Sequence, residues 1–480
     1  MSRTDTLGAL EAQARLLDPN GDVRQEMLKQ ATAYAEQFLE GLPGGKTYQP
    51  ADDDGGDWPV GPGEEGESMA ALLAQLARHV DAPGINPASG GHLGYIPGGG
   101  LYPSAVGGFL AGVTNRYSGV HFASPGAVRM EQELVRWMAD LAGLPASAGG
   151  DLTSGGSTAN LSAIVAARDA AGMKAADVPR SCVYMTRQVH HCVDKALRVA
   201  GLAECPIRFV PMDGRFRMDE SLLAEQIEAD RKQGLKPWMV VASAGTTDTG
   251  AVDPLLKIAS ICRAEGLWLH VDAAYGGFFL LCEEGRRALA GLDRADSIVM
   301  DPHKGLFLPY GTGAILVREV DRLARAHHYH ADYMQDAATG APGYSPADLS
   351  PELSRPFRGL GLWLPLKLFG LAPFRAALAE KIELARYFHE QVSEIPGFAA
   401  GPFPDLSVVT FVFNPRQEDR ESANRRLLQA VQQDGRVFIS STRVNAEFTL
   451  RAAILHFRTH RAEVDHLLGI LRDTAREIDA

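Results

Sequence analysis

The strongest chemical signal in the sequence is a lysine that follows an apolar strand. Residues 301–305 read Asp-Pro-His-Lys-Gly and come directly after the apolar run Ser297–Met300. A lysine held partly out of water at the end of a strand can lose its proton and form a Schiff base with an aldehyde cofactor. Lys304 is therefore a candidate nucleophile, although a surface lysine after a strand would be the simpler interpretation if this motif stood alone.

A second motif supplies a carboxylate at the end of another apolar run. Residues 270–277 read His-Val-Asp-Ala-Ala-Tyr-Gly-Gly. Asp272 could cap a helix or bind a metal. A carboxylate is also what a pyridine cofactor needs opposite its ring nitrogen, because it keeps that nitrogen protonated and lets the ring accept electrons. Ala274 is small enough to lie against one face of such a ring.

Three further segments bring glycines, hydroxyls and imidazoles to predicted strand ends. Residues 153–160 open a helix whose first amides could bind a phosphate, and they match neither a P-loop nor the GxGxxG spacing of a dinucleotide site. Residues 188–195 contain His190, which could stack on a cofactor ring, although a lone histidine is more often structural. Residues 244–250 add threonine hydroxyls. The five motifs follow the order phosphate loop, stacking histidine, hydroxyls, carboxylate and lysine.

The elements that must position these residues form an α/β pattern. Between about residues 151 and 317, short apolar strands alternate with helical segments, which predicts a mostly parallel sheet with helices on both faces. Sites in such sheets lie just beyond the carboxyl ends of the strands. The predicted strands are Cys182–Met185, Ile207–Val210, Met239–Ala242, Leu267–Val271, Ser297–Met300 and Ala314–Val317.

The rest of the chain predicts a helical start and a smaller second domain. After residue 400 the pattern reads strand, helix, strand, strand and helix, with strands at Val408–Phe413, Val437–Ser440 and Phe448–Leu455. Residues 327–356 are rich in Gly, Ala, Pro and Asp, which is typical of a functional lid or mobile loop. We therefore expect three parts, namely an N-terminal helical segment 1–88, a large cofactor-binding domain 89–370 and a small α+β domain 371–480.

The composition excludes several classes of protein. With 480 residues, 45% of them hydrophobic, the chain can fold into two or three packed units. Its net charge of −12 disfavours partners such as nucleic acid or an anionic membrane. No apolar run could span a bilayer, and the first residues lack a signal pattern. Five cysteines without a CxxC pair predict reduced thiols and a cytoplasmic location. No metal site is predicted, because His327, His328 and His330 lack a further ligand.

The motifs at residues 270–277 and 301–304, taken together, resemble the group II pyridoxal-phosphate-dependent amino-acid decarboxylases. This family includes aromatic-amino-acid and glutamate decarboxylases, and the resemblance extends from about His92 to Arg458. It implies pyridoxal 5'-phosphate as the cofactor and the fold type I architecture shared with aspartate aminotransferase. It also implies a homodimer with active sites at the subunit interface, where residues 1–88 would pack.

The resemblance further implies a role for each matching residue. Lys304 would be the Schiff-base lysine, and Asp272 would pair with the ring nitrogen. The other cofactor contacts would be the stacking His190 rather than His191, Ala274 on the opposite ring face, Gly156 and Ser157 in the phosphate turn, His303 beside the phosphate, and Thr247.

Two more matches concern turnover. Tyr333 falls where the family has the tyrosine of its mobile catalytic loop, and Arg451 matches an active-site arginine suited to a substrate carboxylate. A packing tyrosine and an exposed strand cation are the plainer alternatives. The expected reaction is α-decarboxylation of an L-amino acid to an amine and CO2, in which Tyr333 returns a proton to Cα.

The residues expected near the substrate differ from those of many relatives. Asp301 and Gly305 replace the asparagine and tryptophan of many relatives, and residues 92–100 replace the aromatic-rich substrate segment of animal aromatic decarboxylases. An aromatic L-amino acid is favoured, since Tyr95, Tyr102, Phe109 and Phe122 could line an apolar pocket or equally form ordinary core. The alternatives are glutamate, aspartate or 2,4-diaminobutyrate as substrate, an aldol-type carbon–carbon lyase, and a non-catalytic cofactor scaffold, against which the retained chemical residues speak.

Overall fold

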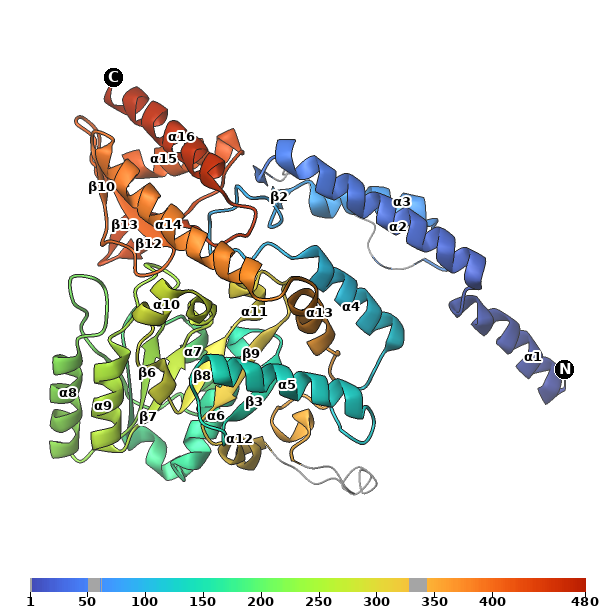
Figure 1. The fold of residues 1–480 in the computed structure, drawn as a ribbon, viewed down its shortest axis with the longest axis horizontal. Coiled ribbons are helices and arrows are strands. Elements are labelled where there is room, and N and C mark those ends of the chain that lie inside the picture. The colour runs from blue at the N-terminus through green and yellow to red at the C-terminus, as the bar shows by residue number, and fades with distance from the viewer. Residues whose placement is uncertain (1, 51–60, 62, 328–342) are drawn as a thin grey trace.

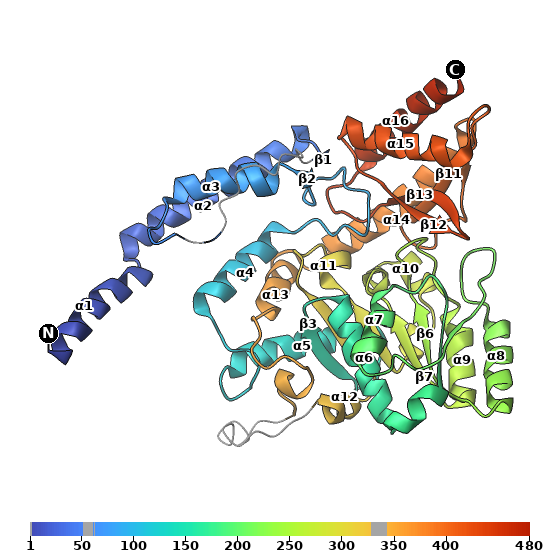
Figure 2. The same cartoon turned by 180° about the vertical axis from the view of Figure 1, so that it is seen from behind.

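The computed structural model describes residues 2–50, 61, 63–327 and 343–480 of the chain. They form a long N-terminal helical arm, a large α/β body and a smaller C-terminal unit (Figures 1 and 2). Tyr333 and half of the segment predicted to be a lid lie outside the described residues.

A seven-stranded sheet with the order β3-β9-β8-β7-β6-β4-β5 forms the centre of the body. Neighbouring strands from β5 to β8 run parallel, and β9 runs antiparallel to β8 and β3. The predicted α/β class with a mostly parallel sheet is thus confirmed. The strands are β3 (Gly149–Thr153), β4 (Ser181–Met185), β5 (Ile207–Phe209), β6 (Lys236–Ser243), β7 (Trp268–Asp272), β8 (Ser297–Met300) and β9 (Gly313–Val317).

Both faces of this sheet are buried, which explains why its strands read as continuous apolar runs. In β6, Val240 and Ala242 pack into one hydrophobic core, while Met239 and Val241 pack into another on the opposite face. Helices α5, α8 and α9 cover the first face, and α6, α7 and α12 cover the second. These helices are α5 (Pro125–Leu141), α6 (Gly156–Ala170), α7 (Cys192–Val199), α8 (Glu220–Lys232), α9 (Leu255–Glu265) and α12 (Val320–His327).

The C-terminal unit is an antiparallel sheet of order β10-β11-β13-β12 packed against helices. The strand predicted at Val437–Ser440 is wrong, because the chain enters β12 only at Ser440. Asn445 and Ala446, with φ of 50° and 67°, make the turn between β12 and β13 and so fix the register of that hairpin. The elements are β10 (Phe398–Ala400), β11 (Val408–Phe413), β12 (Ser440–Val444), β13 (Glu447–Ala453), α14 (Ala372–Glu394), α15 (Arg420–Asp434) and α16 (Arg461–Asp479).

A buried ion cluster holds the chain around Arg355 against the body. The guanidinium of Arg355 pairs with Asp151 of β3 and, at 3.1 Å, with Glu131 of α5. Glu131 also accepts a 2.8 Å hydrogen bond from the amide of Gly359 at the start of α13 (Gly359–Phe369). Burial raises the pKa of Glu131 to about 7 despite the nearby arginine. Two carboxylates therefore share one guanidinium inside the protein.

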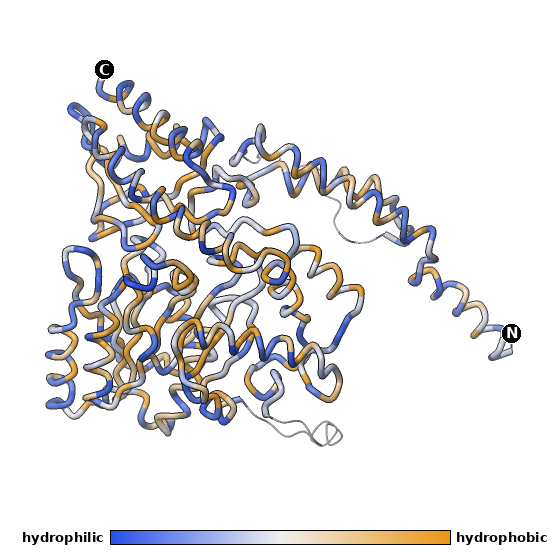
Figure 3. Tube along the Cα trace, in the orientation of Figure 1, coloured by the Kyte–Doolittle hydropathy of each residue, from blue (hydrophilic) through white to orange (hydrophobic). Residues whose placement is uncertain are grey.

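The arm consists of α1 (Arg3–Ala14), α2 (Gly21–Gly41) and α3 (Met69–Leu76), none of which contains a buried residue. It projects away from the body, and hydrophobic residues alternate with hydrophilic ones along its length (Figure 3). Leu16 and Leu17, at the end of its first section, are 83% and 89% exposed. Among the described residues no single helix is long and apolar enough to cross a membrane; α13 and α14 meet that criterion only as a pair bent by 93°.

Candidate active site

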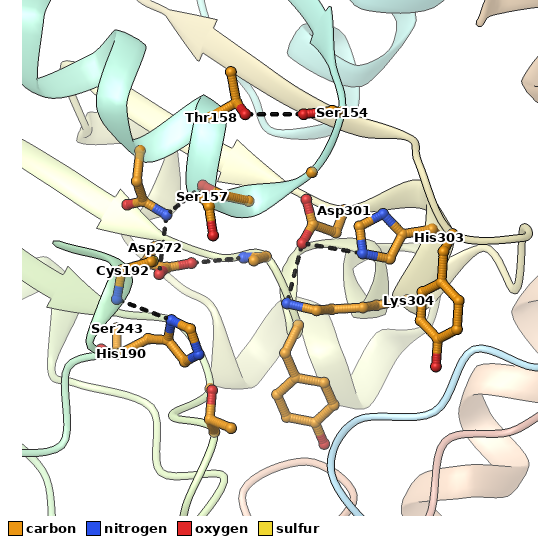
Figure 4. A pocket seen from close by; sticks show the side chains of 18 of the residues that line it. Ser154, Ser157, Thr158, His190, Cys192, Ser243, Asp272, Asp301, His303 and Lys304 are labelled. Carbon is orange, nitrogen blue, oxygen red and sulfur yellow. Dashed lines mark hydrogen bonds and ion pairs between the residues drawn. The ribbon is translucent and has the colours of Figure 1, made fainter. Parts of the chain in front are cut away.

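A cavity of about 310 Å³ lies at the carboxyl ends of the central strands. Strand β8 ends at Met300, and Pro302 then opens the short helix α11 (Pro302–Gly305), which carries Lys304. Strands β6 and β7 end beside it, and their last residues, Ser243 and Asp272, line the cavity together with the turn that follows β3. The predicted residues that it brings together are Gly156, Ser157, His190, Thr247, Asp272, Ala274, His303 and Lys304 (Figure 4).

Lys304 faces two carboxylates. Its Nζ lies 3.0 Å from Asp301 Oδ2, and its side chain is 25% exposed. Burial lowers the pKa of Lys304, but the charges of Asp301 and Asp272 outweigh it, so that pKa lies above its ordinary value. The expectation that partial desolvation releases the lysine proton is therefore wrong for the protein without its cofactor, because the carboxylates hold the ammonium form.

Asp272 is fixed by two hydrogen bonds at the end of β7. Its Oδ1 accepts the amide of Ala274 at 3.0 Å, and its Oδ2 accepts Asn160 Nδ2 at 3.3 Å. The same Nδ2 donates to the carbonyl of Gly156 at 2.8 Å, which identifies it as the amide nitrogen of Asn160. The carboxylate is thus aimed into the cavity by the helix that begins at the glycine turn.

Behind Asp272, a chain of hydrogen bonds allows only one assignment of donors and acceptors. Trp268 Nε1 donates to Ser297 Oγ at 2.8 Å, and His270 contacts Ser297 Oγ through Nδ1 and Asn160 Oδ1 through Nε2, each at 2.8 Å. Burial lowers the pKa of His270 to about 4, so the ring is neutral and carries a single proton. Since Asn160 Oδ1 only accepts, that proton lies on Nε2, and Ser297 donates to Nδ1.

Two of these groups were missed as site residues. Asn160 and His270 both stand inside the recognised motifs, yet neither received a role. The sequence signal was their adjacency to the glycine turn and to Asp272. It does not show that one reaches the other across the layer between α6 and β7, because that contact exists only in the folded protein.

His190, and not His191, lines the cavity. Its Nδ1 accepts the amide of Cys192 at 3.2 Å, which fixes the ring and leaves the proton on Nε2. Burial, followed by the charge of His191, lowers the pKa of His190, so the ring is neutral at physiological pH. A flat, neutral imidazole is suited to stacking on an aromatic ring.

The turn before α6 needs glycine at two successive positions. Gly155 has φ 154°, and a Cβ at Gly156 would lie 2.8 Å from Asp301 Oδ2 and 3.4 Å from Ala274 Cβ. The amides of Ser157 and its neighbours open a helix of 15 residues, which favours an anion. His303 donates from Nδ1 to the carbonyl of Thr312 at 2.6 Å, and burial lowers its pKa.

These features fit pyridoxal phosphate. The glycine turn and the start of α6 would hold the phosphate, the oriented carboxylate of Asp272 would meet the ring nitrogen, and Lys304 Nζ would meet the aldehyde. The methyl of Ala274 and the neutral ring of His190 both line the cavity and would suit contact with a flat ring.

Arg451 and Tyr95 do not line this cavity. Arg451 Nη2 donates to the carbonyls of Tyr95 at 2.8 Å and Thr247 at 2.6 Å, while Nε and Nη1 donate to Asp248 O and Ser440 Oγ. Burial lowers the pKa of Arg451 to about 10, so it remains a cation at neutral pH. Tyr95 is 58% exposed. In this structure Arg451 organises backbone around the site.

Comparison with known proteins agrees with this geometry. The model of the pyridoxal-dependent decarboxylase conserved domain matches residues 59–413. An aromatic-L-amino-acid decarboxylase of Bacillus atrophaeus is 34% identical over 86% of this chain and 87% of its own, and tyrosine decarboxylase 2 of Arabidopsis thaliana is 32% identical over 82% and 74%.

Among solved structures, that of Oryza sativa TDC with PLP and tryptamine superposes with a TM-score of 0.90 at 26% identity, covering 96% of this chain and 99% of that one. This likeness confirms the predicted fold type I architecture. The chain therefore belongs to the pyridoxal-dependent decarboxylases, carboxy-lyases that act on amino acids with pyridoxal phosphate as cofactor.

Proposed function

We propose that this enzyme removes the carboxylate of an aromatic L-amino acid and releases the amine and CO2. The observation that carries the proposal is the convergence of Lys304, Asp272 and His190, from three separate strand ends, on one cavity. The substrate class is supported by relatives at least 30% identical that are named aromatic-L-amino-acid, tyrosine and tryptophan decarboxylases.

The side chains of the cavity would divide the work as follows. Lys304 Nζ would hold the cofactor through its aldehyde carbon. Asp272 would keep a proton on the ring nitrogen, and its two hydrogen bonds already fix the orientation of the carboxylate. When bound, the cofactor supplies an electron sink for the pair left by the departing carboxylate.

The remaining contacts would position the ring. The neutral imidazole of His190 would stack on one face of the ring, and the methyl of Ala274 would lie against the other. Gly156, Ser157 and His303 would hold the phosphate, and Thr247 lines the same cavity. Tyr333, which falls outside the described residues, is proposed as the acid that protonates Cα, and Arg451 and Tyr95 as parts of the substrate side of the site.

An apolar cavity supports an aromatic substrate. It measures about 530 Å³ and shares His303 and Tyr310 with the cavity around Lys304. Its other lining residues include Phe38, Leu76, Tyr102, Leu308 and Pro309. Arg458 and Asp81 are the charged side chains at its wall. An apolar wall favours a ring over a carboxylate, because a buried charge without a partner is costly.

We also propose that the enzyme is a homodimer whose active sites lie at the interface, with residues 1–88 packed against the partner. The bare apolar arm supports this, as does helix α4 (Tyr102–Thr114), on which Phe109 and Val113 are 52% and 67% exposed. Exposed apolar area of this extent usually marks an interface. The division into 1–88, 89–370 and 371–480 belongs to the same proposal.

A cytoplasmic location is supported by the thiols. All five cysteines are free and buried. Free thiols persist in reducing compartments, where disulfides are rare.

The experiment that tests the function is a panel of amino acids incubated with the purified, cofactor-loaded enzyme, with amine and CO2 measured together. We expect turnover of tryptophan, tyrosine or phenylalanine and little of glutamate, aspartate or 2,4-diaminobutyrate. Preferential turnover of the acidic or diamino acids would overturn the substrate class. Cleavage of a phosphorylated amino alcohol without CO2 from any amino acid would replace decarboxylation by aldol-type lysis.

A further inference from the structure

Asp301 is a buried carboxylate that does not cap the helix it precedes. It is 1% exposed and stands at the first position before α11, where an aspartate usually accepts an amide hydrogen bond from the helix. Its side chain makes no such bond. Among the described residues, no hydrogen bond of good geometry reaches either of its carboxylate oxygens. Its close polar contacts are Lys304 Nζ, at 3.0 Å, and His303 Nε2, at 3.6 Å (Figure 4).

The carboxylate is held in this position by backbone on two sides. A Cβ at Gly156 would lie 2.8 Å from Asp301 Oδ2, and one at Gly313 would lie 2.6 Å from Oδ1. Asp301 therefore has little room to turn away from Lys304. A buried carboxylate needs a compensating charge, and the ammonium of Lys304 is the nearest one.

The other groups that face Lys304 cannot replace this interaction. Burial lowers the pKa values of His190 and His303, and it raises that of Tyr310 and, to about 12, that of Cys192. At neutral pH these four side chains are uncharged. The second carboxylate, Asp272, also raises the pKa of Lys304 by its charge, but Asn160 and the amide of Ala274 hold it in place.

We propose that Asp301 is a positioning residue that holds Lys304 as an ammonium until the cofactor arrives, so that this ion pair must open before Lys304 can bind the cofactor. The inference rests on the proposed role of Lys304. In the capture step the ammonium gives up a proton, and the free amine attacks the aldehyde carbon. The carbon–nitrogen double bond forms as the carbonyl oxygen leaves as water, and the nitrogen regains one proton. Lys304 thus needs a charge change that Asp301 opposes.

The test follows capture itself rather than turnover. Full-length apoenzyme is mixed rapidly with pyridoxal phosphate, and the yellow absorbance of the lysine adduct is recorded between about pH 6 and pH 9. Asp301→Asn keeps the shape and removes the charge. It should capture faster at neutral pH, by about tenfold for each unit by which the pKa of Lys304 falls. Its rate profile should also shift to lower pH.

Asp296→Asn is the matched control. Asp296 precedes the same strand at its opposite end, where it accepts the amide of Leu269 at 2.8 Å, and it should leave the capture rate unchanged. If Asp301→Asn proves unstable by thermal melting, Asp301→Ser removes the same charge with a smaller side chain. Equal capture rates and equal pH profiles in the wild type and both Asp301 variants would overturn the inference.

A second aldehyde separates the two groups that Asp301 faces. Pyridoxal lacks the phosphate but carries the same aldehyde. Faster capture of both compounds by Asp301→Asn supports an effect on Lys304. Faster capture of pyridoxal phosphate alone would mean that Asp301 repels the phosphate, which overturns the inference. If the wild type forms no adduct, or forms it on another residue, the proposed function itself fails.

Discussion

The Nε2 proton of His270 is directed at the amide oxygen of Asn160, 2.8 Å away, and this contact orients the group that holds Asp272. The bond joins a strand of the sheet to the helix that opens at the glycine turn. It places a neutral histidine behind a charged carboxylate, so Asp272 remains the negative group that faces the ring nitrogen.

Replacing His270 should weaken the site without touching the cofactor. His270→Phe removes the donor and leaves Asn160 Oδ1 buried without its partner, a loss of about 1–3 kcal/mol. We expect weaker cofactor binding, measured by absorbance titration of apoenzyme. Ser162→Ala, on the same helix α6, is the control, because Ser162 Oγ is buried with no hydrogen-bond partner among the described residues. Unchanged affinity in His270→Phe would contradict the orienting role.

Arg451 offers a test of positioning against carboxylate binding. Arg451→Met removes the donors to the carbonyls of Thr247 and Tyr95, and each buried acceptor left unpaired costs about 1–3 kcal/mol. We expect a lower melting temperature and a raised KM. The product amine should also inhibit less strongly, with a larger inhibition constant. A raised KM with unchanged inhibition by the amine, which lacks the carboxylate, would show direct carboxylate binding instead. Arg443→Met, on the exposed part of β12, is the matched control.

Glu131 should make stability depend on pH in a defined direction. Its pKa rises from 4.5 to about 7 on folding, so the folded state binds a proton that the unfolded state has released between these values. The contribution of Glu131 is complete below pH 4.5 and is lost as the pH rises through about 7. It amounts to at most about 3 kcal/mol.

The measurement compares denaturant unfolding of the wild type and Glu131→Gln from about pH 5 to pH 8. The difference in unfolding free energy between the two should change over this range, whereas titrating groups that do not interact with Glu131 cancel in the comparison. Glu133→Gln, on the exposed side of the same helix, should show no such change. Parallel pH curves for the wild type and Glu131→Gln would contradict the assignment.

The proposed acid Tyr333 can be tested although it lies outside the described residues. Positioned proton transfer contributes about 10²–10⁴-fold, so Tyr333→Phe should slow amine formation by roughly that factor. Tyr344→Phe is the control, since Tyr344 stands beyond the gap and donates to Asp321 at 3.1 Å. Aldehyde and ammonia should be assayed together with the amine. Normal turnover by Tyr333→Phe would exclude this tyrosine as the acid.

The N-terminal arm should form part of the proposed dimer interface. Leu10 and Leu17 are 62% and 89% exposed, and replacing both by aspartate puts charge into the proposed interface. We expect monomers by light scattering at micromolar concentration and a parallel loss of decarboxylation. The matched control is Glu11→Asp with Arg15→Lys on the same helical section, which keeps the charges. A dimer that survives the aspartates would place the interface elsewhere.

How far the sequence predicts this molecule depends on how local each feature is. Lys304, Asp272 and His190 could be predicted because each follows its own apolar strand, and parallel strands bring their ends together. The bounds of β8 and β11 were also predicted correctly. The strand at Val437–Ser440 was not, because apolar residues are equally buried when a loop packs under a sheet, as Val437 and Ile439 do.

The part of the site that the sequence does not predict is formed by contacts between the helix layer and the sheet. No pattern along the chain shows that Asn160 spans from α6 to both His270 and Asp272, or that Arg451 closes on carbonyls more than two hundred positions earlier. The sequence also predicts a deprotonated Lys304 from desolvation alone, whereas the structure places Asp301 close enough to reverse the sign.

The five sequestered thiols make the native enzyme a slow target for alkylation. Burial raises the pKa values of Cys182, Cys192 and Cys262 to about 11, 12 and 12, so almost none of each is thiolate at neutral pH. Modification by iodoacetamide then has to wait for local or global opening. The labelling rate of each cysteine, measured by mass spectrometry of the peptides, would therefore report how often the core around that cysteine opens.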